Sequence, residues 1–366
     1  IILGSNEERT FPTNDFFDYY LSLKNSFLNQ MNEWDKDVQP FPQPSAEHRD
    51  WSQEALKWMH DKDHLSLIAS INHTQIKKLN DQGIQTVKGL SEAANDSRCK
   101  GMHSSTFQNL KDQARLQLET RDIRSNQVEE TPPAFEIKKH ENRGLFLLPP
   151  SSPQDIFFDL EGFPLAEGGL EYLWGATYHS DEQLQFIDWW AHNHSDEEAA
   201  FISFIDWAVD RWKRDPRMHI YHYAPYEKTA LRRIAGRCGK REEELDDLLR
   251  NEVFVDLYQI VRQGLIVGEE SYSIKKIERL YRSARSGEVN TSMGSVVAYA
   301  DWMESGEPKD WRKSPLLESI RSYNKDDCDS TWELYSWLQK TQKDSEIIFQ
   351  QPANKTQREL TEKDLE

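Results

Sequence analysis

Two carboxylates at the end of an apolar run are the residues of this chain whose types and spacing most clearly suggest chemistry. The run covers residues 156–160, contains Asp159, and is followed by Glu161 and Gly162. In a strand, residues two apart project from the same face, so both carboxylates would point the same way. Carboxylate oxygens are hard ligands suited to Mg²⁺ or Mn²⁺, and one strand supplies only part of a coordination shell. We therefore expect acids from elsewhere in the chain to complete a divalent-metal site.

A second acid, Glu227, lies where a strand gives way to a helix. Residues 218–223 are apolar and aromatic, an Ala-Pro pair interrupts the pattern, and Glu227 falls in the first turn of the helix that follows. This carboxylate could ligate a metal, or could simply interact with the helix dipole, which is worth about 0.3–1 kcal/mol. His219 and His222 are three apart and would face opposite sides of a strand. We expect them to be ordinary strand histidines that share no metal.

The third candidate pairs Tyr323 with Asp327 in the long helical pattern over residues 316–338. The two residues are four apart, so they share one helix face with Ile320 and Thr331. An acid within an otherwise core-facing stripe needs compensation, either from a metal ion or from a buried Arg or Lys. Tyr323 is either a core residue or, if functional, a group whose hydroxyl orients a water.

The pattern from Leu145 onward is that of one α/β domain. Helical spacing follows the strand candidates, which favours a mixed sheet flanked by helices. Glycines and charged turns between the first three candidates suit an antiparallel meander. The sequence has neither a Walker-type phosphate loop nor a GxGxxG motif, so no motif indicates nucleotide hydrolysis or dinucleotide binding. The strand candidates are residues 156–160, 172–178, 184–190 and 218–223.

The stretch before Leu145 has a different organisation. Short helical patterns alternate with tight turns at Gly83 and Gly101. Paired helices around glycine hairpins can grip a nucleic-acid backbone through amides and helix N-termini, although a plain helical spacer is equally compatible with the pattern. The predicted parts are a domain remnant, a small helical domain, a linker, the α/β domain and a polar tail, over residues 1–60, 61–118, 119–144, 145–341 and 342–366.

The composition of the chain narrows the classes of function that it could have. The formal net charge of -18 excludes a global positive field that attracts nucleic acid, so any such contact must be local. The chain's 3 cysteines are far apart and form neither a zinc spacing nor a disulfide framework, as expected for reduced thiols in a cytoplasmic protein. No apolar run approaches the roughly 20 residues that span a bilayer, so no membrane partner is expected. The chain begins with Ile1, and we expect it to be a piece of something longer.

Positive charge is nevertheless concentrated in one short segment, where only Glu278 opposes it. Tyr272 and Tyr281 add aromatic faces on which bases could stack. The segment is either a nucleic-acid contact or a solvated basic helix face. Contacts of this kind bind the backbone and carry no base-sequence specificity. The candidate contacts are Lys275, Lys276, Arg279 and Arg282, with Arg285 beyond them.

Together, the three acidic motifs resemble the DEDD superfamily of 3′ to 5′ exonucleases, which have a ribonuclease-H-like fold. Its first motif, Asp-x-Glu on the first strand, matches Asp159 and Glu161. Its second motif, His-Asn-x-x-(Phe/Tyr)-Asp, is similar to residues 222–227. Its third motif, Tyr-x-x-x-Asp, matches Tyr323 and Asp327 and indicates the tyrosine branch. The order and spacing of all three agree with the superfamily.

Over a longer span, residues 1 to about 341 resemble a piece of the RecB-like nuclease family, in which a ribonuclease-H-like domain follows a helical hairpin segment. Members of that family begin with a PD-(D/E)xK nuclease domain, and residues 1–60 resemble only its end. Many members continue into a superfamily-1 helicase, so a helicase partner in cis or in trans is implied. The stretches that carry this resemblance are residues 149–162, 171–173, 219–223 and 272–278.

Two departures from the family pattern matter. Glu227 stands where the superfamily usually has Asp, and its extra methylene shifts the carboxylate by roughly an ångström or more, which affects the geometry of a second metal. Relatives often carry clustered cysteines near the position of residues 47–50, but this chain has none there. We therefore expect no iron-sulfur cluster.

The resemblance implies two-metal hydrolysis of phosphodiester bonds, with two Mg²⁺ or Mn²⁺ ions and a water positioned by Tyr323. The implied substrate is DNA, as single strands or 3′ ends, in repair or processing. One alternative is a binding module that has lost its chemistry and serves a helicase or nuclease partner, and another is an exoribonuclease. Asp256, at the end of a further apolar run, is a lesser candidate for the same cleft. The implied metal ligands are Asp159, Glu161, Glu227 and Asp327.

Overall fold

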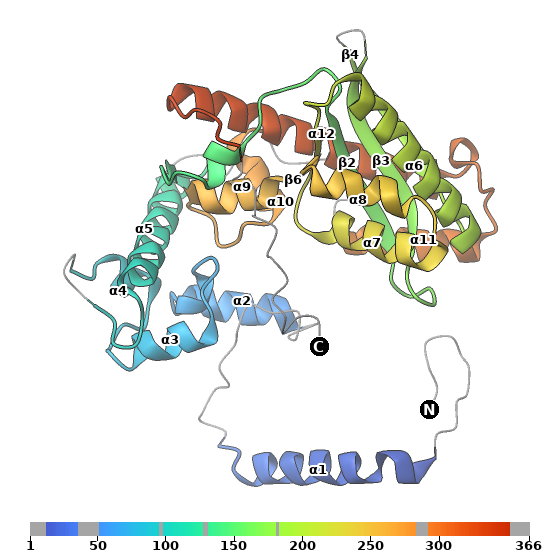
Figure 1. Cartoon of the computed structure of the whole chain (residues 1–366). Helices are drawn as coiled ribbons and strands as arrows, with labels where there is room; N and C mark the ends of the chain where they lie inside the picture. The colour runs from blue at the N-terminus through green and yellow to red at the C-terminus, as the bar shows by residue number, and fades with distance from the viewer. Residues whose placement is uncertain are drawn as a thin grey trace, which may run out of the picture. The chain divides into compact units, whose positions relative to one another are not determined.

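The computed structural model describes residues 12–35, 51–94, 98–126, 131–180, 183–282 and 292–351 (Figure 1). The chain divides into two compact units, Ile1–Asp61 and Lys62–Glu366. The first unit contains helices α1 (Thr13–Asn32) and α2 (Ser52–Asp61). Residues 47–50, on which the expectation about an iron-sulfur cluster depends, lie outside the described residues.

The second unit begins with a helical region. It contains η2 (Leu65–Leu67), α3 (His73–Asn80), α4 (Val87–Ser91) and α5 (Ser104–Asn126). Asn72 and Gln75 form a capping box that starts α3, and the Thr86 hydroxyl caps α4. Gly83 and Gly101 both have positive φ, as the tight turns after α3 and before α5 require. The glycine turns predicted from the sequence are therefore present.

A five-stranded sheet with the order β4-β3-β2-β5-β6 forms the centre of the same unit (Figure 1). Strands β2, β3 and β4 are an antiparallel meander, while β5 runs parallel to both β2 and β6. The sheet is therefore mixed, and the α/β class predicted from the sequence is confirmed. The strands are β2 (Ile156–Phe163), β3 (Leu170–Ser180), β4 (Gln183–Trp190), β5 (Ile220–His222) and β6 (Phe254–Asp256).

Helices cover both faces of this sheet, and the alternation along β2 decides which side chains meet them. Phe158 and Leu160 belong to the core formed with α6 (His194–Arg214), α7 (Tyr226–Cys238) and α8 (Glu242–Arg250). Phe157 belongs to a second core, which includes Leu334 of α12 (Pro315–Asp344). Because residues of odd number share the face of Phe157, the pleat directs Asp159 and Glu161 toward α12.

The remaining elements lie between α5 and α12 in the chain. They are β1 (Phe135–Ile137), η3 (Gly144–Leu147), α9 (Leu257–Gly264), β7 (Leu265–Val267), α10 (Ile274–Ile277), η4 (Glu278–Leu280), α11 (Ser292–Ser305) and η5 (Trp311–Lys313).

Where the sequence predicts an exposed linker, over 119–144, α5 continues to Asn126 and β1 pairs with β7. The Gln113 side chain of α5 donates a hydrogen bond of 2.7 Å to the Val267 carbonyl, so α5 is attached to β7. Within the described residues, no helix is long and apolar enough to cross a membrane.

Candidate active site

Three carboxylates meet where β2 passes α12. Asp159 and Glu161 come from the strand and Asp327 from the helix, and one oxygen of each lies within 4.8 Å of the others. We call these residues the acidic triad. Their separation is short enough for a single divalent cation to contact all of them, and carboxylate oxygens are the ligands that Mg²⁺ and Mn²⁺ prefer. Three of the four metal ligands predicted from the sequence are thus brought together.

Asp159 is oriented by a buried amide that sequence reasoning missed. The Asn324 side chain of α12 is fully buried, and its Nδ2 donates a hydrogen bond of 2.7 Å to Oδ2 of Asp159. Gly175 lies directly opposite Asp159 in the β2–β3 register. A Cβ on Gly175 would lie 1.8 Å from Oδ1 of Asn324, so only glycine leaves room for the amide. The available sequence signal was an asparagine next to Tyr323 in the helix that carries Asp327.

Glu161 also has an unpredicted partner. The buried hydroxyl of Ser295 donates a hydrogen bond of 2.5 Å to Oε2 of Glu161. Ser295 belongs to α11, and no motif in the sequence connects that helix with the strand. A register shift between Glu161 and Gly162 marks a β-bulge, a feature that redirects side chains where strand pairing is interrupted.

Burial and mutual repulsion raise the pKa values of Asp159 and Glu161. Burial raises the pKa of Asp159 well above its ordinary value, and the charges of Asp327 and Glu161 raise it further. Burial and Asp327 also raise the pKa of Glu161, to about 8, although the Ser295 hydroxyl opposes the change. Without a cation, the site therefore disfavours full ionisation, and a bound cation would relieve this repulsion.

Tyr323 lies beside the triad on the same face of α12 as Asp327. Its hydroxyl donates a hydrogen bond to Asp327, and burial together with the charges of Asp327 and Glu161 raises the pKa of Tyr323. The phenol is therefore a neutral hydrogen-bonding group in the physiological pH range. This placement agrees with the helical spacing from which the pair was predicted.

The domain that contains these residues is similar to a known protein family. Residues 156–339 match the RNase_H_2 family, which is described as RNase_H superfamily. The chain belongs to this superfamily. Membership indicates a nuclease-like domain that binds nucleic acid, and RNase H-like nucleases usually use divalent metals. No curated protein and no solved structure matches the chain.

Glu227, the fourth predicted ligand, takes a different position in the RNase H-like domain. Among the described residues, the group of carboxylates that satisfies the 4.8 Å distance does not include it. Glu227 is buried, and its Oε2 lies 3.2 Å from Nδ1 of the fully buried His222. Burial and the charges of the other triad members raise the pKa of Asp159 most, and the charge of Glu227 raises it further. The Nδ1 atom of His222 instead donates a hydrogen bond of 2.6 Å to the Ala224 carbonyl, and Oε2 of Glu227 accepts no hydrogen bond from the described residues.

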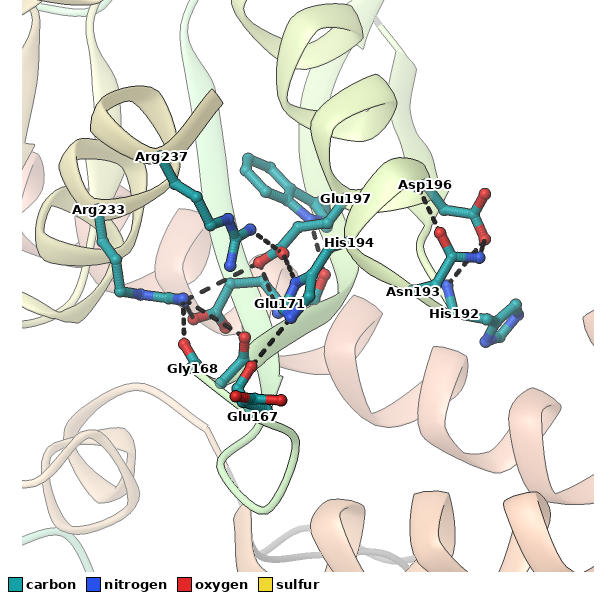
Figure 2. A network of polar contacts seen from close by, with 12 residues as sticks. Glu167, Gly168, Glu171, His192, Asn193, His194, Asp196, Glu197, Arg233 and Arg237 are labelled. Atoms are coloured by element: carbon teal, nitrogen blue, oxygen red, sulfur yellow. Dashed lines mark hydrogen bonds and ion pairs between the residues drawn. The ribbon is translucent and has the colours of Figure 1, made fainter. Parts of the chain in front are cut away.

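A polar network fixes helix α7, which carries Glu227, to the sheet (Figure 2). Arg233 donates to Oε1 of Glu171 on β3 at 2.5 Å, and Arg237 pairs with the fully buried Glu197 of α6. Glu197 also accepts a hydrogen bond of 2.9 Å from the Glu171 backbone amide. Two arginines of one helix thus connect it to both a strand and a neighbouring helix.

The same network reaches the residue that precedes Glu227. The Tyr226 hydroxyl donates a hydrogen bond of 2.8 Å to Oε2 of Glu171. This contact passes over Gly162, where a Cβ would lie 2.2 Å from the tyrosine oxygen. Gly162, Tyr226 and Glu171 therefore connect β2, α7 and β3 beside the triad.

The four predicted nucleic-acid contacts differ in their surroundings. The Lys275 ammonium lies 5.4 Å from the centre of the Tyr323 ring, next to the triad. Lys276 and Arg279 pair instead with the buried Glu269, at 4.0 and 3.6 Å. Arg282 is mostly buried and forms ion pairs with three carboxylates, and Arg285 lies outside the described residues. The partners of Arg282 are Glu278, Asp326 and Glu333.

Asp256, the lesser candidate, has a structural explanation. Its Oδ1 accepts hydrogen bonds of 2.9 Å from the backbone amides of Tyr258 and Ala224. The first contact caps α9, and the second supports Ala224 in a left-handed conformation with φ of 74°. His219 lies apart from His222, and burial lowers its pKa to about 4.

Proposed function

We propose that the RNase H-like domain is a metal-dependent nuclease that hydrolyses phosphodiester bonds, as a DEDD-type 3′ to 5′ exonuclease of the tyrosine branch acting on single-stranded DNA. One observation carries the proposal. The oxygens of Asp159, Glu161 and Asp327 lie within 4.8 Å of one another. Tyr323, from the same motif as Asp327, donates a hydrogen bond to it.

The donor set fits one hard divalent cation. Burial and repulsion within the triad supply a reason to bind positive charge, and Asn324 and Ser295 hold two of the carboxylates in place. A bound Mg²⁺ or Mn²⁺ would polarise the phosphate and make a water more acidic. Glu227, whose buried Oε2 accepts no hydrogen bond from the described residues, would contribute to a second ion, as the superfamily pattern implies.

The chain's own residues would orient the reactants. The neutral Tyr323 hydroxyl, held by Asp327, can position the attacking water. Asn324 fixes the orientation of Asp159 through its 2.7 Å hydrogen bond, so the carboxylate needs little reorganisation when substrate binds. Tyr323→Phe should therefore lower kcat more than it changes KM.

The helical region supports a role in gripping DNA. Turns with positive φ at Gly83 and Gly101 resemble the hairpins of DNA-binding helical pairs, and Lys78 donates a hydrogen bond of 2.5 Å to the Gly101 carbonyl. The N-termini of helices that follow such turns can hold phosphate. We extend the proposal to membership of the RecB-like family and to a superfamily-1 helicase partner in DNA repair or processing.

One observation favours a second candidate, a nucleic-acid-binding module with weak or no chemistry. Among the described residues, Glu227 lies outside the 4.8 Å group, and its extra methylene relative to Asp departs from the superfamily pattern. A fourth ligand held away from the triad would impair a second metal site. A binding module would then account for the retained fold.

The test uses 5′-labelled single-stranded DNA and RNA of one sequence, incubated with the chain and Mn²⁺. The proposal predicts stepwise shortening of DNA from its 3′ end, abolished by EDTA and by Asp159→Ala. Faster shortening of the RNA would reassign the substrate. Binding without cleavage, unchanged by Asp159→Ala, would contradict the catalytic function and favour the binding module.

A further inference from the structure

Lys275 places a positive charge beside the acidic triad. Its ammonium lies 5.4 Å from the ring centre of Tyr323, the residue that donates a hydrogen bond to Asp327. This contact places the ammonium beside the tyrosine that neighbours the triad.

The neighbouring lysine is used differently. Lys276 follows Lys275 directly, but its ammonium lies 4.0 Å from Glu269. Glu269 is buried and also pairs with Arg124 at 2.5 Å, which connects α5 to the segment after β7. Two adjacent lysines therefore have separate surroundings, one at the triad and the other at the contact with the helical region.

The short helix that carries Lys275 is anchored at both ends. Before it, Tyr272 is buried, and its hydroxyl accepts from the Val267 amide at 3.2 Å and donates to Gln113 at 2.9 Å. The Tyr272 carbonyl accepts a hydrogen bond of 2.5 Å from the Tyr223 hydroxyl. At the other end, Ile277 is fully buried. The position of Lys275 is thus determined by the core rather than by a free surface loop.

We propose that Lys275 is a catalytic residue whose ammonium contacts a non-bridging oxygen of the scissile phosphate. This inference rests on the proposed nuclease function and deepens it. As the water oxygen bonds to phosphorus and the P–O3′ bond breaks, negative charge grows on the phosphate, and a fixed cation stabilises it. The water's hydroxyl remains on the released 5′-mononucleotide, and one proton reaches the 3′-oxygen. Lys275 stays protonated throughout.

The position of Glu227 bears on what the Lys275 charge would add to the site. Because Glu227 lies outside the triad's distance, the triad favours one cation more clearly than two. A lysine beside the triad would then supply positive charge that a second ion supplies in a two-metal site. The bound cation and the Lys275 ammonium would then act on the same phosphate.

The experiment compares Lys275→Met with Lys276→Met, which remove the same charge from adjacent positions. With Mn²⁺ and labelled single-stranded DNA, Lys275→Met should lower kcat about 10²–10³-fold, as for loss of a transition-state donor. Lys276→Met should leave kcat within about threefold of the wild type, because this ammonium pairs with Glu269 away from the triad. Equal effects of the two variants, or a change in KM alone, would overturn the assignment.

A measurement of nucleotide binding tests the contact between Lys275 and phosphate independently of cleavage. In Mn²⁺, dTMP should bind Lys275→Met about tenfold more weakly than the wild-type chain, the loss expected for one charged hydrogen bond. Its affinity for Lys276→Met, and thymidine binding by all three proteins, should not change. Unchanged dTMP affinity in Lys275→Met would refute the phosphate contact. A wild-type chain that binds dTMP but cleaves nothing would instead contradict the proposed function.

Discussion

The Nδ2 atom of Asn324 lies 2.7 Å from Oδ2 of Asp159, and this hydrogen bond joins helix α12 to the central carboxylate of strand β2. The amide fits only because Gly175, opposite Asp159, has no side chain. Orientation of the triad therefore depends on a residue that contacts a proposed metal ligand without being one.

Asn324→Ala should weaken Mn²⁺ binding about 10–100-fold, the usual effect of losing a partner that orients a metal ligand. Gly175→Ala should reproduce the loss, because its Cβ would lie 1.8 Å from Oδ1 of Asn324 and displace the amide. Mn²⁺ titration followed by electron paramagnetic resonance measures both. Wild-type affinity in a folded Asn324→Ala protein would show that the amide has no orienting role.

Gly162 should be energetically coupled to Tyr226. In Gly162→Ala, the new Cβ would lie 2.2 Å from the tyrosine hydroxyl and 2.6 Å from Oε2 of Glu171, so the hydrogen bond between them must break or shift. We expect destabilisation of about 2 kcal/mol, reduced by about 1 kcal/mol when Tyr226→Phe removes the nearer oxygen.

Urea unfolding of the wild type, both single variants and the double variant measures this coupling. Thr229→Val is a suitable control, because it removes a hydroxyl from the same helix whose hydrogen bond goes to the Pro225 carbonyl. Strict additivity of the Gly162 and Tyr226 changes would mean that the predicted overlap is absent.

Metal removal should make the domain's stability depend on pH. The folded-state pKa values of Asp159 and Glu161 are raised, the latter from 4.5 to about 8. Folding therefore favours their protonated forms, so this stabilisation is present below the unfolded pKa and is lost as pH rises through the folded one. In EDTA, Tm should fall between about pH 5 and about pH 8.

Saturating Mn²⁺ should reduce this dependence, because the cation stabilises the ionised carboxylates. Glu161→Gln should reduce it in EDTA as well, since one shifted group is gone. Differential scanning calorimetry at several pH values provides the measurement. A metal-free Tm that stays level or rises over this interval would contradict the raised pKa values.

Local patterns in the sequence predicted much of the fold and the triad. The strand over residues 156–160, the meander after it and the final helix follow from period and turn residues, and Asp159 and Glu161 share a face because of the pleat. Tyr323 and Asp327 were found through the four-residue spacing of a helix face. In each case, all the residues that form the pattern lie within one strand or one helix.

The partners of these residues could not be predicted in the same way. Ser295 reaches Glu161 from α11, and Asn324 reaches Asp159 through the space left by Gly175, so both depend on contacts between distant elements. The placement of Glu227 outside the triad's distance likewise depends on how the chain turns after β5. Single-residue chemistry gave each candidate, but tertiary packing determined which candidates meet.

The most direct test of the central claim, that Asp159, Glu161 and Asp327 form the metal centre, is the Mn²⁺ affinity of Asp327→Asn beside that of Asp326→Asn. The two variants remove the same charge from adjacent residues of α12, but Asp326 pairs with Arg282 at 3.1 Å, whereas Asp327 belongs to the triad. We predict that Asp327→Asn loses affinity by a factor of about 10² or more, while Asp326→Asn stays within about threefold of the wild type. Equal affinities of the two variants, with both proteins folded, would contradict the claim that the triad binds the metal.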